Sequence, residues 1–187
     1  MIFHRPGPCR FIVPPPPVGI ERVTSFKLLG VYLASTLSME NHINYVLLLV
    51  NQRLYLINQL RKQGLSAKAR EVVFHSLVIS RLLYALPAFV GFLSGADIAR
   101  FNSVFRKSVR WGIIDRMFDF DELSISSQDQ LFKRFSTNFN HCLHQLLPEL
   151  RNTCYMLRQR GHSFSLPVVS RTLFKKSFVV NYLYSHM

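Results

Sequence analysis

The fold of this chain is decided around Ser25–Leu33, a short apolar run that reads SFKLLGVYL and carries a glycine near its centre. Small and polar residues follow the run, and a long helical pattern begins directly after them. A glycine inside a strand pattern usually marks a bulge or a place where another backbone comes close. We therefore expect Gly30 to lie at such a close approach.

A β-hairpin is predicted at the start of the chain. Phe11–Val13 is one candidate strand, and Thr24–Leu33 is the other. Pro14–Pro17 lies between them and should form a polyproline-like loop, because proline fixes φ and lacks a backbone donor. The two strands are therefore expected to pair antiparallel across a wide, proline-rich connection.

Three amphipathic helices are predicted next. Ser38, Ser66 and Ser94 stand where a side-chain oxygen can cap a helix, and Gly64 and Gly112 stand where the first and third helices should end. Apolar residues recur at steps of three and four in each helix. The stripes are Ile43, Leu47, Val50, Leu54 and Ile57; then Ala69, Val72, Ser76, Ile79, Leu83 and Leu86; then Ile98, Phe101, Phe105 and Val109.

The second helix is the most apolar part of the chain. Its stretch Leu82–Leu93 is shorter than the roughly 20 residues that a membrane span needs, and Pro87 should kink or end it. It is interpreted as a core helix, and no membrane is expected as a partner. One bundle core should bury Ile43, Val50, Leu54, Ile79, Leu83, Phe101 and Phe105.

The fold class predicted is mainly α: a small β-hairpin, a bundle of three or four helices and an irregular basic tail. The segments are 1–37, with the hairpin and the proline loop; 38–112, the bundle; 113–150, an acidic linker and a helix; and 151–187, an exposed tail with one short helix near Phe174–Tyr182. The helix in 113–150 should bury Leu131, Phe135, Phe139, Cys142 and Leu146 and stop at Pro148.

The net charge of +13 indicates a polyanionic partner, most often nucleic acid. Segments 1–38, 39–111, 112–150 and 151–187 carry +3, +7, −3 and +6. The alternative is a solvated basic surface without a partner. No signal peptide is visible, and three cysteines, an odd number, favour a reducing compartment over a disulfide framework. An intracellular location is therefore expected.

Two groups of residues could hold a metal, and both are better interpreted as structural. Asp119, Asp121 and Glu122 fit a solvated turn before a helix, since no other carboxylate pattern supports a site. A zinc site usually shows two ligand pairs at recognisable spacing. Here there is only one pair, His141 and His144, with Cys142 between them and Cys154 beyond.

Cations and tyrosines remain as candidates for binding. Arg100, Lys107 and Arg110 share a helix face, which is either a duplex contact or a solvated stripe. Arg53, Arg61 and Lys62 lie toward the end of the first helix, where cations suit the dipole in any case. Three tyrosines on the helices are interpreted as core aromatics in preference to base-stacking platforms. They are Tyr45, Tyr55 and Tyr84.

A set of motifs, in order, resembles the C-terminal part of the reverse transcriptase of non-LTR (LINE-type) retrotransposons, over nearly the whole chain. The order and spacing make the resemblance specific, more than any single piece. The motifs are Phe3–Pro6, Ile20–Val23, Phe26–Val31, His42–Val46, Gln52–Leu56, Leu60–Lys62, Val73–Val78, Leu83–Phe89, Leu157–His162 and Leu173–Phe178.

The resemblance implies that Leu29–Val31 belongs to the primer grip and that the helices form the thumb, which holds the primer–template duplex. Nucleic acid would then contact, through its backbone, Lys27, Gly30, Arg53, Arg61, Lys62, Arg100, Lys107 and Arg110. The metal-binding palm aspartates, one pair of them in a Tyr-Ala-Asp-Asp type motif, are absent from this sequence. A fragment without catalysis, cofactor, metal or small-molecule substrate is therefore expected.

Two alternatives remain. The chain could be an interaction or structural remnant without a ligand. The segment Phe26–Lys62 is also similar to the N-terminal module of an AlkB-like alkylation-repair protein, which implies methyltransferase or 2-oxoglutarate-dependent dioxygenase chemistry. None of the seven histidines is followed two places later by Asp, and no glycine-rich cofactor loop follows a strand. We therefore expect neither activity.

Overall fold

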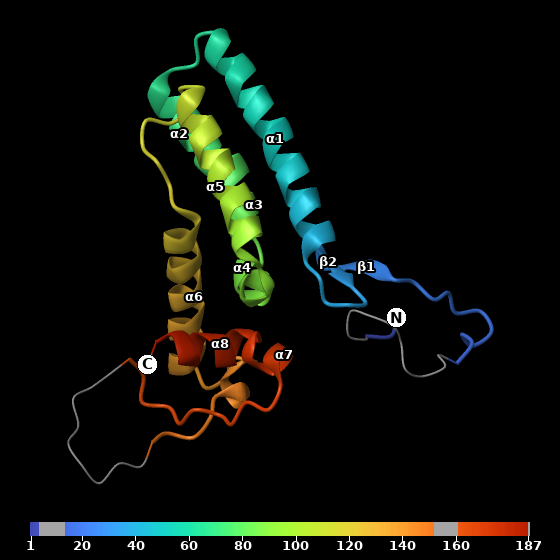
Figure 1. Ribbon diagram of the computed structural model, residues 1–187. Helices are drawn as coiled ribbons and strands as arrows, with labels where there is room; N and C mark the ends of the chain where they lie inside the picture. The colour runs from blue at the N-terminus through green and yellow to red at the C-terminus, as the bar shows by residue number, and fades with distance from the viewer. Residues whose placement is uncertain (4–13, 152–160, 187) are drawn as a thin grey trace. The chain divides into compact units, whose positions relative to one another are not determined.

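The computed structural model describes residues 1–3, 14–151 and 161–186. The fold is mainly α with one N-terminal hairpin, as predicted (Figure 1). The chain forms two compact units, and it passes between them three times. Unit 1 comprises Met1–Leu82 with Ser94–Met117, and unit 2 comprises Leu83–Leu93 with Phe118–Met187. These units therefore cut across the segments predicted from the sequence.

The hairpin is formed by β1 (Ser25–Leu28) and β2 (Val31–Ala34), which pair antiparallel. Its two turn residues both have positive φ, 45° at Leu29 and 87° at Gly30. Positive φ at both central positions defines the type I′ turn, whose twist matches that of the flanking strands. Gly30 is therefore a turn residue, and the prediction of a bulge or close approach inside a strand was wrong.

Thr24–Leu33 was predicted as a single strand, which was wrong, because it contains β1, the turn and most of β2. Phe11–Val13 lies outside the described residues. Pro14–Pro17 is exposed, as expected. The mistake arose because Leu29 was counted as a strand residue, although a leucine can occupy the left-handed region at a modest energetic cost.

Helix α1 (Glu40–Lys62) agrees closely with its prediction. The N-cap residue of α1 is Met39 and not the predicted Ser38. The Ser38 hydroxyl nevertheless accepts a hydrogen bond from the Glu40 amide at 3.3 Å. At the other end Gly64 takes φ 93°, and the Leu65 amide donates to the Leu60 carbonyl at 3.0 Å. The whole predicted stripe is buried, namely Ile43, Leu47, Val50, Leu54 and Ile57.

The second helical run contains a π-helical turn. Helix α2 (Ala67–Phe74) leads into η1 (His75–Ile79), a π-helix, and then α3 (Ser80–Leu83). A π turn adds one residue to the helical repeat, so that later side chains change face. The Arg53 guanidinium donates to the Leu77 carbonyl of this turn, which ties η1 to α1.

The predicted stripe of this run matches the buried residues only in part. Val72 is 60% exposed, Ser76 is exposed and Leu83 is only half-buried, whereas Ile79 and Leu86 are buried as predicted. Phe74, Val78 and Leu82 are buried although the stripe did not include them. The mismatch begins at Val72, before η1, so the π turn alone does not account for it.

The run stops before Pro87, where Ala85 takes φ 55°. Proline then lies in the first turn of α4 (Leu86–Phe89), a position that requires no amide donor, and η2 (Val90–Phe92) follows. Among the described residues, Ala67–Phe92 is long and apolar enough to cross a membrane by length and composition alone. Core helices also meet that criterion, and Leu86 and Phe89 are buried.

Helix α5 (Gly95–Arg110) returns to unit 1, where α1 packs against both α2 and α5 (Figure 1). A capping box starts it: the Ser94 hydroxyl accepts from the Asp97 amide, and the Asp97 carboxylate accepts from the Ser94 amide. Phe101 and Phe105 are buried as predicted, and Gly112 follows the helix at φ 61°.

Unit 2 is built on α6 (Phe120–Thr137), which begins and ends earlier than predicted. The Asp119 carboxylate caps it by accepting from the Asp121 amide at 3.3 Å. Phe139, Cys142 and Leu146 follow the helix and are exposed, so their predicted burial was wrong. The short turn η3 (His144–Leu146) comes before Pro148.

The described part of the predicted tail is not loose. Helices α7 (Thr172–Lys175) and α8 (Phe178–Ser185) form there, and Tyr182 of α8 stacks on Phe132 of α6 at 4.1 Å. The Tyr182 hydroxyl donates to Asp129 at 2.9 Å, and burial, then this carboxylate, raises the pKa of Tyr182 to about 12. The second core consists of Phe132, Phe135, Val179, Tyr182 and Leu183.

Gly91→Ala should destabilise the protein by about 1–3 kcal/mol, as overpacking does. A β-carbon there would lie 2.3 Å from the Lys176 carbonyl oxygen, a backbone atom that cannot rotate away. Gly95→Ala is the matched control, since no atom lies within 4 Å of its new methyl group. It should be neutral or stabilise α5 by up to about 1 kcal/mol. Urea denaturation of both variants tests this contact, and equal midpoints would contradict it.

The side of the helix that is buried just after the π turn can be tested by replacing two neighbouring leucines, one at a time. Leu82 is 2% exposed, so Leu82→Ala should cost about 2–5 kcal/mol. Leu83 is half-buried, so Leu83→Ala should lower the free energy of unfolding by less than about 2 kcal/mol, because less apolar surface is lost from the folded core. A larger loss at Leu83 in urea denaturation would mean that the helix is in the phase first predicted.

Candidate nucleic-acid interface

Helix α1 has an apolar face on its solvent side as well as on its core side. At about 100° per residue, Leu48 and Tyr55 of this outer face lie opposite the buried stripe that contains Val50, and Leu56 and Leu60 project from a neighbouring side of the helix. Large apolar side chains are more often buried than grouped on the outside of a helix, so the group marks a candidate contact surface. Its exposed members are Leu48, Tyr55 and Leu56, each 57% exposed, and Leu60 at 40%. The interpretation of Tyr55 as a core aromatic was therefore wrong.

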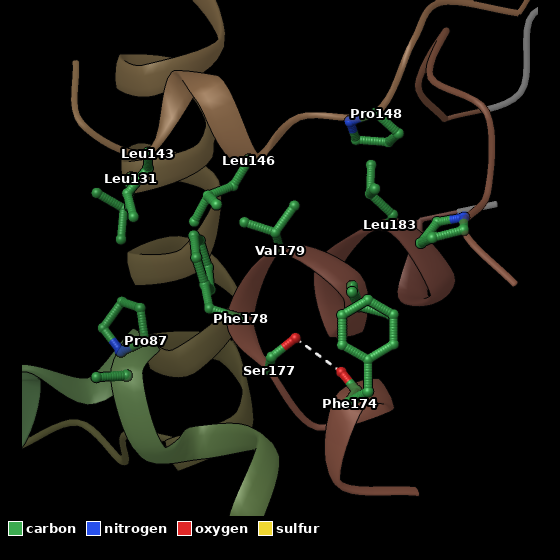
Figure 2. A pocket seen from close by; sticks show the side chains of 13 residues that line it. Pro87, Leu131, Leu143, Leu146, Pro148, Phe174, Ser177, Phe178, Val179 and Leu183 are labelled. Atoms are coloured by element: carbon green, nitrogen blue, oxygen red, sulfur yellow. Dashed lines mark hydrogen bonds between the residues drawn. The ribbon is translucent and has the colours of Figure 1, made fainter. Parts of the chain in front are cut away.

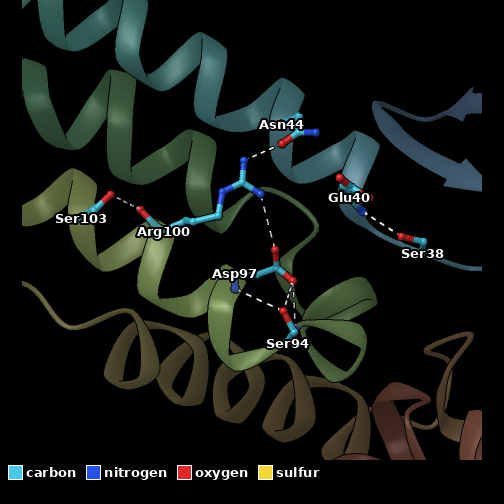
Figure 3. A network of polar contacts seen from close by, with 7 residues as sticks. All are labelled: Ser38, Glu40, Asn44, Ser94, Asp97, Arg100 and Ser103. Carbon is cyan, nitrogen blue, oxygen red and sulfur yellow. Dashed lines mark hydrogen bonds and ion pairs between the residues drawn. The ribbon is translucent and has the colours of Figure 1, made fainter.

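One border of the outer face is formed by hydrogen bonds between α1 and α5. The Asn44 side-chain oxygen accepts from the Arg100 guanidinium, and Asn51 accepts from the Lys107 ammonium at 2.8 Å (Figure 3 shows the first pair). Arg100 also lies 3.6 Å from the Asp97 carboxylate. The two acceptors and the two donors are each seven residues apart, so both helices present the same repeat to one another.

The other border is a cluster of cations around one tyrosine. The Lys27 ammonium of β1 lies 3.1 Å from the Tyr45 hydroxyl and 4.5 Å from the centre of its ring. The Arg81 guanidinium of α3 lies 5.4 Å from the same ring, and Tyr32 of β2 packs edge-on against it at 5.1 Å. Tyr45 therefore joins three segments that are distant in the sequence.

The electrostatic potential in this cluster is positive. The hydrogen bond from Lys27 lowers the pKa of the Tyr45 hydroxyl, and the charges of Lys27, Arg81 and Arg53 lower it further. Positive charge favours the phenolate, which is why the pKa moves in that direction. An anion placed beside Tyr45 would be stabilised for the same reason.

Beneath the cluster lies His42, only 1% exposed. Its Nδ1 accepts a hydrogen bond from the Tyr32 amide at 3.4 Å and so links the hairpin to α1. Burial, then the charges of Arg81 and Lys27, lowers the pKa of His42 from 6.5 to about 4. This histidine is therefore neutral at pH 7.

The predicted contact residues are only partly brought together. Gly30 is in the turn that places Lys27 opposite Tyr32, so its role is conformational. Arg61 donates to the Asn58 side chain at 3.2 Å, near the end of α1. Lys62 and Arg110 are exposed and, within the described residues, form no ion pair.

Sequence analysis missed two residues at the borders. Arg81 is a single cation in a long apolar run, which is the signal that could have singled it out. Asn51 belongs to a stripe with Asn44 and Asn58 at seven-residue spacing, and the same spacing separates Arg100 from Lys107. Comparing the two spacings would have suggested that the helices pair.

The candidate metal ligands have local structural roles in the described part of the chain. Asp119 caps α6. His141 Nδ1 accepts from the Leu143 amide at 3.2 Å, and the ring of His144 lies 2.7 Å from the Phe135 carbonyl, to which its Nδ1 donates. Among the residues described, no three His, Cys, Asp or Glu side chains converge. Cys154 lies outside them.

Comparisons with protein-family models, with curated proteins and with solved structures find no match to this chain. They therefore neither support nor contradict the resemblance to a reverse transcriptase. Any assignment of function depends on the geometry of α1 and its borders.

His42 predicts a specific dependence of stability on pH. Its folded pKa lies below its unfolded pKa, so the unfolded state binds the proton more tightly. Stability should fall as the pH drops from 6.5 toward 4, by about 3 kcal/mol in all, and this residue should contribute no further loss below that range.

The measurement is urea denaturation of the parent and of His42→Gln at pH 7 and pH 4.5. Glutamine can still accept from the Tyr32 amide, but it does not titrate. The parent should lose about 2–3 kcal/mol more than the variant between the two pH values. Equal losses would show that His42 is protonated without cost.

Proposed function

We propose that unit 1 binds a nucleic-acid duplex through its sugar–phosphate backbones, as the thumb region of a non-LTR reverse transcriptase would, without itself catalysing polymerisation. One observation carries the proposal: two exposed side chains of α1, Leu48 and Tyr55, lie between the cations that α5 holds beside Asn44 and Asn51 and the cations around Tyr45. Arg100 and Lys107 form one border, and Lys27, Arg53 and Arg81 form the other.

A duplex groove offers the complementary arrangement. Sugars and base edges lie along its floor, and a phosphate backbone runs along each side. The minor groove of an A-form duplex is wide and shallow, whereas that of B-DNA is only about 6 Å wide. A helix face with cations on both sides therefore fits the minor groove of an A-form duplex or the major groove of B-DNA, which is about 12 Å wide and admits a helix.

The borders are held in place before any ligand arrives. Asn44 and Asn51 hold Arg100 and Lys107 beside α1, and Tyr45 holds Lys27. Holding flexible cations in position reduces the entropy lost on binding. Neutral amide and phenol partners leave the positive charge available for phosphates, whereas carboxylates would cancel it.

The charge of unit 1 supports the same conclusion. Its sequence contains fifteen Lys and Arg residues against five Asp and Glu. Contacts of this kind fix a protein on a duplex without specifying its sequence. The alternative, a structural remnant without a ligand, draws support from the Asp97–Arg100 ion pair, which neutralises one border cation.

The test removes border charge while keeping the hydrogen bonds. Lys27, Arg100 and Lys107 are replaced together by glutamine, which still donates to Asn44, Asn51 and Tyr45. The parent should show log affinity that falls linearly with log salt, and the slope should flatten by about 0.9 per lost contact on duplex DNA. Fluorescence anisotropy on B-DNA and on an RNA–DNA hybrid of equal length measures both the slope and the preference.

The matched control replaces three exposed cations of unit 2, Lys133, Arg134 and Arg171, by glutamine. It removes the same charge and should keep the parent's slope. If both triple variants flatten the slope equally, the binding is a general effect of net charge. If the parent does not bind at low salt, the resemblance describes ancestry alone.

The apolar face has its own test. Tyr55→Ser should weaken binding by a similar factor at every salt concentration, because an apolar contact releases no counterions. Phe139→Ser is the control, since Phe139 is 81% exposed and belongs to unit 2. An effect of Tyr55→Ser on the slope alone would contradict the arrangement proposed.

A further inference from the structure

Unit 2 contains an apolar cavity of about 390 Å³ that opens to solvent (Figure 2). Three parts of the unit form its walls: Pro87 and Ala88 of α4, Leu131 of α6 with the η3 segment, and α7–α8. Cavities of about 300–1,000 Å³ are the size range of small-molecule sites in proteins. The proposed nucleic-acid surface lies in unit 1, so the cavity is a separate feature.

The lining carries no charge and one polar side chain. That side chain is Ser177, whose hydroxyl donates to the Phe174 carbonyl at 2.7 Å. The bond is drawn in Figure 2. The remaining side chains are leucine, valine, phenylalanine, proline and alanine.

Water fills such a space poorly. The cavity has about a dozen times the ~30 Å³ that one molecule occupies in the liquid, and an ordered water needs two to four polar partners. Water in this open cavity finds few polar partners, so an apolar molecule can displace it without losing hydrogen bonds. A charged ligand group would find no partner inside and would pay for its desolvation.

Part of the lining is apolar surface that solvent still reaches. Leu146 is 62% exposed and Phe174 is 47% exposed, and both border the cavity. A molecule seated in the cavity would cover part of both side chains. Covering them adds to the free energy of binding in proportion to the apolar area removed from water.

We propose that this cavity is a binding site for a small uncharged apolar molecule, an aromatic ring system or an aliphatic chain. Volume sets the size of the occupant, and the uncharged lining sets its polarity. The hydroxyl of Ser177 contributes little, because its proton is already committed to the Phe174 carbonyl. A polar end of the ligand, where it has one, stays in solvent.

The probe is N-phenyl-1-naphthylamine, a neutral dye whose fluorescence rises in apolar surroundings. Titrated into the full chain, it should bind one site saturably and raise the thermal midpoint of unfolding, since it binds the folded state. Ala88→Phe places a ring in the cavity without removing an existing contact. This variant should bind the dye at least about tenfold more weakly, because the new ring occupies the space that the dye needs.

Ala99→Phe is the matched control, because Ala99 is an exposed helical alanine of unit 1. It should bind the dye as the parent does, and Ser177→Ala should too. Circular dichroism verifies that each variant folds. The cavity of the parent can be filled in a second way by Leu146→Trp, at a lining position that is 62% exposed, and this variant should give the same loss if Ala88→Phe fails to fold.

Three results would overturn the proposal. One is unchanged affinity in both filled variants that fold. Another is dye binding without saturation. The third is found by sedimentation: a dimer whose dissociation opens the dye site would show that a second copy of the chain occupies the cavity. Loss of nucleic-acid binding in the variant of Lys27, Arg100 and Lys107 leaves all these outcomes unaffected, since these three residues lie in unit 1.

Discussion

Two hydrogen bonds between α1 and α5 fix the arrangement on which unit 1 depends. Asn44 and Asn51 accept from Arg100 and Lys107, seven residues apart on each helix. Apolar packing alone tolerates sliding, because one leucine or valine fills a space much as another does. Paired polar groups favour one register, since a shift would exchange each bond for a bond to water and lose about 0.5–1.5 kcal/mol. The same bonds place cations along α1, so the register of the bundle and the charge of its surface have one cause.

The sequence predicted the structure correctly where residues close together in the chain decide it, without contacts from distant segments. The stripe of α1, the Ser94 cap and the glycine after α5 were all predicted, because spacing and capping chemistry decide them. It failed at η1, where the Leu77 carbonyl receives Arg53, since a partner on another helix decides whether a π turn persists. In the tail, a short helix near Phe174–Tyr182 was predicted and α8 forms there, but its burial against Phe132 and Phe135 was not predicted, because the tail was expected to stay exposed.

The candidate interface was predicted in its residue types but not in its geometry. Charge indicated a polyanion, and four of the named cations lie in the borders of α1, namely Lys27, Arg53, Arg100 and Lys107. The spacing of residues in the sequence could not predict that Lys27 and Arg81 both contact Tyr45, because they belong to a hairpin and a helix that are far apart in the chain. Contacts between distant segments follow from tertiary packing, and no pattern within one segment encodes them. The cavity of unit 2 is a further case, because three separate segments form it.

The path of the chain between the units affects the order in which they can fold during synthesis. All of unit 1 has been made once Met117 leaves the ribosome, whereas Leu83–Leu93 belongs to unit 2 and is made earlier than its partners. Its helix α4 contacts α6 and α8, and α8 lies at the far end of the described chain. At a typical elongation rate of about 5–20 residues per second, the buried side chains of α4 wait several seconds for cover. Until α6 and α8 have been made, the apolar side chains of α4 therefore have no partner from unit 2 to cover them.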